Sequence, residues 1–182
     1  LTVYTSDHGD YMGSHGAHNT KEHPHEESVR IPAIFHWPER IPAQGQVDGL
    51  FSLVDLMATT LGLVGADTPA WQQGTDFAPT LSGEAFTGPR DVLLEMVGSP
   101  RWNLGMPDWR GLVDERWKYA FIENRIELVY DLEADPFEQH NLATEDPATC
   151  ARLRARLLEL LRETREPFWD VLIEHGVACD QQ

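Results

Sequence analysis

Lysine is scarce in this chain, and positive charge as a whole is in short supply. The 182 residues include two lysines, Lys21 and Lys118, and 14 lysine plus arginine residues stand against 30 aspartate plus glutamate residues. The formal net charge is −16. This balance argues against a nucleic acid partner, because binding to a phosphate backbone needs a basic surface.

Cysteine is equally scarce, with two residues. Cys150 and Cys179 are too few for a disulfide framework, and their spacing matches no metal-binding motif. We expect Cys150 on the apolar face of a helix and Cys179 near a chain end that frays. The sequence also lacks an apolar run long enough to span a membrane, and no signal peptide is visible. We therefore expect no membrane partner.

The length of the chain allows one domain of ordinary size or parts of two. A hydrophobic content of 41% and six tryptophans are compatible with a packed core. The chain begins without Met and inside a strand pattern, so we expect it to be the C-terminal part of a longer protein.

The first nine residues combine a strand pattern with side chains that suit a metal site. Leu1 to Thr5 is a short apolar, β-branched run that predicts a buried strand, and Ser6-Asp7-His8-Gly9 follows directly. In open α/β sheets, ligand-binding groups gather beyond the carboxyl ends of parallel strands. Asp7 and His8 therefore suggest half of a site for a divalent cation, although such ligands do not name the metal. A polar turn at the strand end is the alternative.

Three segments then follow one another in a fixed order. They are SDHG at residues 6–9, GSHG at residues 13–16 and KEHPHEESVRIP at residues 21–32. In this order and spacing they resemble the sulfatase family of the alkaline phosphatase superfamily. Family members carry S-D-[NH]-G after a strand, then G-x-H-G, then a Lys four residues before an aromatic-E-x-x-[IV]-R-x-P run.

The resemblance implies roles for three residues. Asp7 and His8 would bind a divalent cation, Ca²⁺ in a sulfatase and Mn²⁺ or Zn²⁺ in a related phosphoryl hydrolase. Lys21 would contact the sulfate or phosphate, because hydrolysis puts negative charge on oxygens that a cation and a fixed ammonium stabilise. For Lys21, a solvated surface lysine is the alternative. His8 stands where many relatives have Asn, and an imidazole favours a softer metal than Ca²⁺.

Four histidines crowd the loop between residues 9 and 30, namely His15, His18, His23 and His25. Their spacing matches no compact ligand motif, so we interpret them as loop histidines near a polar cleft. His15, in the GSHG segment, is the best candidate among them for a catalytic role. His25 occupies a position that is usually aromatic in the family, which leaves its packing open.

The family's nucleophile is not in this sequence. Sulfatases carry C-x-P-S-R or S-x-P-S-R in their N-terminal portion, and its first residue becomes formylglycine. No such pentapeptide occurs here, and the nearby pair of aspartates that completes the metal site is also missing. The resemblance thus covers nearly all of this chain, whereas the chain covers only part of the family's enzyme.

The fold class that we expect is α/β, in two parts. Residues 1–88 would form the C-terminal part of the sulfatase catalytic domain, with a buried strand at 31–37 and a core helix that begins near Ser52. Residues 66–90 are rich in Gly, Pro, Thr and Ser, which predicts a crossing loop. Residues 89–182 would form a small α+β subdomain.

This subdomain is expected to hold a four-stranded antiparallel sheet and a packed helix. The strands are predicted at 91–97, 109–113, 117–123 and 127–132. Asp146 and Pro147 form a good helix start, and Pro167 should break the helix before a short one at 168–175. The leucines that should pack on the sheet are Leu153, Leu157, Leu160 and Leu161. Residues 109–142 also resemble the C-terminal signature of sulfatases.

The function that these features favour is hydrolysis of a sulfate ester by the complete protein, on a small-molecule or glycan substrate. Trp102 and Trp109 either line a substrate cleft or cover the small sheet. Two alternatives stay open. One is a phosphodiesterase or phosphonate monoester hydrolase of the same superfamily, and the other is a non-catalytic piece that contributes only packing or assembly. The chain alone, without a nucleophile, is expected to be inactive.

Overall fold

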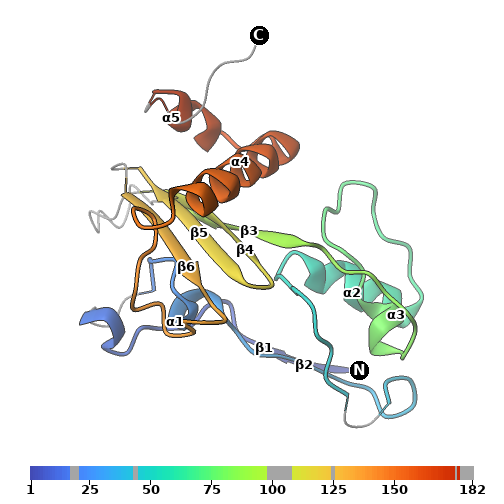
Figure 1. Ribbon diagram of the computed structural model, residues 1–182. Helices are drawn as coiled ribbons and strands as arrows, with labels where there is room; N and C mark the ends of the chain where they lie inside the picture. The colour runs from blue at the N-terminus through green and yellow to red at the C-terminus, as the bar shows by residue number, and fades with distance from the viewer. Residues whose placement is uncertain (17–20, 43–44, 98–107, 124–125, 175, 177–182) are drawn as a thin grey trace. The chain divides into compact units, whose positions relative to one another are not determined.

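The computed structural model describes residues 1–16, 21–42, 45–97, 108–123, 126–174 and 176 (Figure 1). The chain divides into two compact units. The first consists of Leu1–Gly9 and Arg30–Val92, and the second of Asp10–Val29 and Leu93–Gln182. None of the helices in the described part of the chain has the length and apolarity needed to cross a membrane.

The first unit contains a two-stranded antiparallel ribbon. Strand β1, Thr2–Thr5, pairs with β2, Ala33–His36, so that Thr2 lies opposite His36 and Thr5 opposite Ala33. Tyr4 is 62% exposed and Ile34 is 56% exposed. The prediction that both strands are buried is therefore wrong for the chain as described, because a ribbon of two strands cannot cover its own apolar faces.

Helix α2, Asp55–Val64, is the main helix of the first unit. The buried carboxylate of Asp55 accepts hydrogen bonds from the amides of Ser52 and Thr75, both at 2.7 Å. A helix start near Ser52 is thus confirmed, although the N-cap is Val54 and the Asp55 carboxylate ties the helix start to residues outside the helix. A short helix α3, Ala78–Leu81, lies within the segment predicted as a plain crossing loop.

The second unit is built on a four-stranded sheet with the order β3-β4-β5-β6. The strands are β3, Asp91–Met96; β4, Trp109–Asp114; β5, Trp117–Ile122; and β6, Ile126–Asp131. The β4–β5 and β5–β6 pairs are antiparallel. All four predicted strands are confirmed.

Helix α4, Pro147–Thr164, lies across one face of this sheet (Figure 1). Asp146 caps it by accepting a hydrogen bond from the Thr149 amide at 3.0 Å, as predicted. The predicted leucine stripe and Cys150 are buried against strand residues. The helix ends at Arg165, which takes a left-handed φ of 56°, and the last helix is α5, Phe168–Glu174. The stop thus falls two residues before Pro167.

The two faces of the sheet carry different side chains because successive residues of a strand point to opposite sides. Tyr119 and Phe121 of β5 pack in the core under α4. Ala120 and Ile122 pack instead in a second cluster with Trp109 of β4. We call this second side the loop face, because Val29, from the segment 10–29, packs on it. Lys118 has the same parity as Ala120 and also belongs to the loop face.

Candidate functional site

Asp7 and His8 directly follow β1 and lie in the first unit. The Ser6 hydroxyl donates to the His8 carbonyl oxygen at 2.7 Å, and the His8 amide donates to Asp7 Oδ1 at 3.0 Å. These bonds fold the turn so that His8 Nε2 lies 3.5 Å from Asp7 Oδ2. The pKa of Asp7 is lowered by a hydrogen bond from its own amide and by the charge of His8.

The donor atoms of this pair fit a divalent cation. His8 Nδ1 lies 2.7 Å from the Gly9 carbonyl oxygen and donates to it, which directs Nε2 toward the Asp7 carboxylate. Metal-binding histidines usually show this arrangement, with the other ring nitrogen donating to a carbonyl or carboxylate. Two ligands do not complete the coordination of a hard cation, which takes six to eight oxygens in the case of Ca²⁺.

Lys21 lies in the second unit, in the segment that packs on the loop face. Its side chain is exposed, whereas its own backbone carbonyl and the next one accept hydrogen bonds from buried side chains. The Lys21 carbonyl oxygen accepts a hydrogen bond from the buried Ser28 hydroxyl. The next carbonyl oxygen, of Glu22, accepts a hydrogen bond from the indole Nε1 of Trp109 at 2.6 Å. The ammonium is thus presented from an anchored stretch of backbone.

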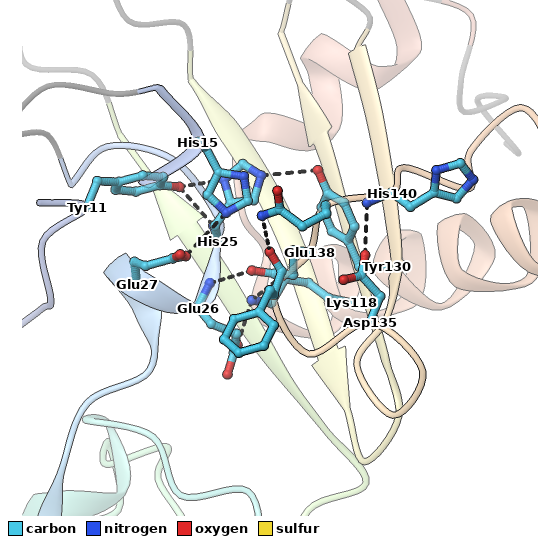
Figure 2. A network of polar contacts seen from close by, with 12 residues as sticks. Tyr11, His15, His25, Glu26, Glu27, Lys118, Tyr130, Asp135, Glu138 and His140 are labelled. Atoms are coloured by element: carbon cyan, nitrogen blue, oxygen red, sulfur yellow. Dashed lines mark hydrogen bonds and ion pairs between the residues drawn. The ribbon is translucent and has the colours of Figure 1, made fainter. Parts of the chain in front are cut away.

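His15 also lies in the second unit and belongs to a polar network (Figure 2). Its Nε2 is 3.5 Å from Glu27 Oε2, and its ring stacks on that of His25 with 4.1 Å between centroids. The His15 side chain is 16% exposed, although the residue as a whole, with its backbone, is exposed. The structure therefore brings Asp7 and His8 together in one unit and describes His15 and Lys21 in the other.

His25 fills its position as an aromatic residue would, with added hydrogen bonds. Its Nδ1 is 2.5 Å from the Tyr11 hydroxyl, and its Nε2 is 3.1 Å from the Tyr130 hydroxyl. Burial, together with the charges of His15 and Lys118, lowers the pKa of His25 to about 4. The ring is therefore neutral near pH 7 and serves as a packed, hydrogen-bonded link between the loop and β6.

The centre of the network is an ion-paired group that the sequence reasoning missed. Lys118 is 1% exposed, and its Nζ lies 2.6 Å from Glu26 Oε1 and 2.8 Å from Glu138 Oε1. Glu138 is 2% exposed, and its Oε2 accepts a hydrogen bond from the Glu26 amide at 2.6 Å. Figure 2 shows these side chains converging from the loop, from β5 and from the chain after β6.

Glu138 occupies this place at a cost in backbone and solvation energy. Its φ of 51° is left-handed, which costs about 1–2 kcal/mol for a residue with a side chain. Burial raises the pKa of its carboxyl, while the charge of Lys118 and the Glu26 amide oppose that rise. Such a residue persists because both of its oxygens meet positively polarised partners.

One cluster in the network has the composition of a metal site. Ligand atoms of His15, Glu27 and Glu138 all lie within 4.8 Å of one another. However, the Lys118 ammonium already lies 2.8 Å from the Glu138 oxygen and supplies the positive charge there. We therefore interpret the cluster as an ion-paired group. His18 lies outside the described residues.

Trp109 resolves one of the open alternatives. It is 4% exposed in β4 and covers the loop face of the sheet, so it does not line an open cleft. Trp102 lies outside the described residues. Two shallow surface hollows contain none of the predicted site residues: one involves Arg40 and Asp76, and the other Arg162 and Asp170.

Comparison with known families identifies the kind of protein to which this fold and these motifs belong. Residues 13–167 match the family described as N-sulphoglucosamine sulphohydrolase, C-terminal. The match covers most of the chain, and the chain belongs to this family. The resemblance to sulfatases that the motifs indicated is thereby confirmed.

Individual relatives agree with this assignment. The chain is 30% identical to an N-acetylglucosamine-6-O-sulfatase of Bacteroides thetaiotaomicron over 93% of its own length and 31% of the relative. It matches the structure of BT4656 in complex with its substrate D-glucosamine-2-N,6-O-disulfate with a TM-score of 0.76 and 27% identity, over 92% of this chain and 34% of that one. The chain spans about a third of the length of the curated relatives it matches.

A third similarity extends the fold beyond sulfatases. The phosphonate monoester hydrolase of Agrobacterium radiobacter matches with a TM-score of 0.74 and 24% identity, over 88% of this chain and 34% of that one. The mixed α/β fold, with its four-stranded antiparallel sheet and packed helix, is therefore shared with parts of enzymes that carry different names.

Proposed function

We propose that this chain is the C-terminal portion of a sulfatase and supplies part of its active site. The observation that carries the proposal is the geometry of the turn after β1. There, a hydrogen bond from Nδ1 to the Gly9 carbonyl fixes His8, and Nε2 and the Asp7 carboxylate lie side by side. Membership of the family and the names of the relatives support the reaction class.

The charges of the candidate residues suggest the role of each in the proposed enzyme. Asp7 and His8 would hold a divalent cation, Ca²⁺ in the sulfatase reading, which would stabilise negative charge on the ester oxygens. Lys21 would place its ammonium against the sulfate group, where a fixed charge lowers the energy of the transition state. His15 is the second candidate for a catalytic contact. The nucleophile would come from outside this chain.

The domain assignment is part of the same proposal. Residues 1–88 would belong to the catalytic domain and residues 89–182 to the C-terminal subdomain. The compact units differ from this division at two places, since residues 10–29 group with the second unit and residues 89–92 with the first. The proposed substrates are sulfate esters of small molecules or glycans, in keeping with the sulfated sugar bound to the structural relative.

Replacing Asp7 tests this proposal. In the full-length protein, Asp7→Ala should remove a charged metal ligand and abolish turnover of sulfate esters. His8→Asn should be milder, because an amide oxygen also binds hard cations. Metal content is measured after exhaustive dialysis alongside turnover. Stoichiometric metal and near-normal activity in Asp7→Ala would contradict the site assignment.

A phosphoryl hydrolase is the second candidate function, and His8 is the observation that favours it. An imidazole nitrogen suits Mn²⁺ or Zn²⁺ better than Ca²⁺, which prefers oxygen. Turnover of matched sulfate and phosphate esters, measured with each metal in turn, separates the two candidates. Faster hydrolysis of the phosphate or phosphonate ester with Mn²⁺ or Zn²⁺ would favour this second reading.

A further inference from the structure

Two consecutive backbone carbonyls, those of Lys21 and Glu22, are held by buried side-chain donors. Trp109 is 4% exposed, and its Nε1 donates to the Glu22 carbonyl oxygen at 2.6 Å. Ser28, also 4% exposed, donates its hydroxyl proton to the Lys21 carbonyl oxygen. The first bond joins the loop to the sheet, and the second joins Lys21 to helix α1 at the end of the loop.

The Trp109 anchor is rigid because it belongs to the sheet. Trp109 is the first residue of β4 and lies opposite Ile122 of β5. Its ring is packed with Ala120 and Ile122 on the loop face, which holds the indole in one orientation. An indole has a single N–H donor, so the direction of this hydrogen bond is set by the packing of the ring.

The Ser28 anchor is rigid because the sheet holds its helix. Ser28 lies in α1, Glu26–Val29. The side chain of Glu26 pairs with Lys118 at 2.6 Å, and its amide donates to Glu138 at 2.6 Å. The start of α1 is therefore tied to β5 and to the chain after β6.

We propose that Trp109 is a positioning residue for Lys21, with Ser28 as its partner. Fixing the carbonyls of Lys21 and Glu22 sets the direction in which the Lys21 side chain leaves the backbone. A lysine side chain has four flexible carbons, so an anchored backbone reduces the orientations that its ammonium must sample. This inference rests on the proposed function, in which Lys21 contacts the sulfate group.

The experiment is a double-mutant cycle in the full-length protein. Trp109→Phe keeps a ring in the core but removes the donor, and Lys21→Ala removes the ammonium. Misplacement of a catalytic group by about 1 Å costs up to about 100-fold, so Trp109→Phe should lower kcat/KM for a sulfate ester by about 10–100-fold. In the Lys21→Ala background, Trp109→Phe should alter kcat/KM by less than about twofold, because the ammonium that Trp109 positions is absent.

Tyr119→Phe is the matched control. It also removes a buried aromatic donor, since the Tyr119 hydroxyl donates to Glu127 Oε1 at 2.5 Å, but on the α4 side of the sheet. It should leave kcat/KM within about twofold in both backgrounds. Inhibition by inorganic sulfate gives a second readout: Trp109→Phe should weaken it only where Lys21 is present.

The outcomes separate the inference from the proposed function. If Lys21→Ala loses turnover and Trp109→Phe causes an equal further loss in that background, the positioning role is wrong, while the role of Lys21 stands. If Lys21→Ala keeps its turnover, the assignment of Lys21 fails, and the positioning role fails with it. Should Trp109→Phe not fold, Ser28→Ala removes the neighbouring anchor and is expected to show the same dependence on Lys21.

Discussion

Removing the charge of Lys118 is predicted to be among the most damaging changes to the second unit. Lys118 is 1% exposed and balances two carboxylates, of which Glu138 is 2% exposed. In Lys118→Met the side chain keeps its volume, but both carboxylates lose their ammonium partner. Breaking a buried ion pair from one side costs about 3–5 kcal/mol, mainly because an uncompensated charge stays buried.

The loss of stability in Lys118→Met should depend on the charge of Glu138, and therefore on pH. Glu138→Gln, added to Lys118→Met, should recover part of the loss, because an amide oxygen still accepts from the Glu26 amide without a net charge. The pKa of Glu138 is already raised by burial, and loss of Lys118 should raise it further. A carboxyl with a raised pKa in the folded state binds protons that the unfolded state releases, so stability falls as pH rises through that pKa.

Native-state hydrogen exchange of the β5 amides in the full-length protein measures the free energy of unfolding locally. Lys118→Met should reduce protection by about 3–5 kcal/mol at neutral pH and regain part of it at acidic pH relative to the wild type. Tyr119→Phe, which leaves the charges in place, is the reference for an ordinary buried hydrogen bond. A loss below about 1 kcal/mol, or an unchanged pH dependence, would refute the reasoning.

Three further predictions concern the site and the chain as given. Lys21→Ala should lower kcat/KM by about 10²–10³-fold without unfolding, and a change under about threefold over several esters would make Lys21 an ordinary surface lysine. His25, with a pKa lowered to about 4, resists protonation when folded, so stability should fall as pH drops below 6.5, and His25→Phe should reduce that fall in acid titrations of unfolding. The chain alone should show no esterase activity, weak affinity for Ca²⁺ and Mn²⁺ by calorimetry, and self-association through the exposed apolar faces of β1 and β2. Micromolar metal binding or clear turnover by the chain alone would contradict the last of these.

Elements with strong local signals were predictable from the sequence. The strands β4 to β6 are runs rich in aromatic and branched apolar residues with short polar segments between them, and Asp146 and Pro147 mark the start of α4. The buried state of β1 and β2 was predicted wrongly, because a continuous apolar run indicates a strand that needs neighbours without showing where those neighbours are. Helix α3 was missed, since its one turn lies among Gly and Pro residues.

The candidate site was predictable only where its residues are adjacent in sequence. Asp7 and His8 share one turn, and their contact could be expected from the motif alone. The contacts of Lys118 could not be expected from the sequence, because Lys118 and Glu138 lie 92 and 112 residues after Glu26. The scarcity of lysine was the one signal that pointed to Lys118, and nothing in the sequence said which carboxylates it meets.

The loop that carries Lys21 is completed by residues made long after it. Glu138 holds the Glu26 amide across 112 residues. At about 5–20 residues per second, a ribosome needs about 6–22 s to travel that distance. The strands β4 to β6, on which the loop packs, are themselves made only in the last part of this interval, so a nascent chain cannot anchor the backbone of Lys21 until long after Lys21 is made. A premature stop between Pro32 and Glu138 would therefore release a polypeptide that contains the motif but lacks the carboxylate that holds the Glu26 amide.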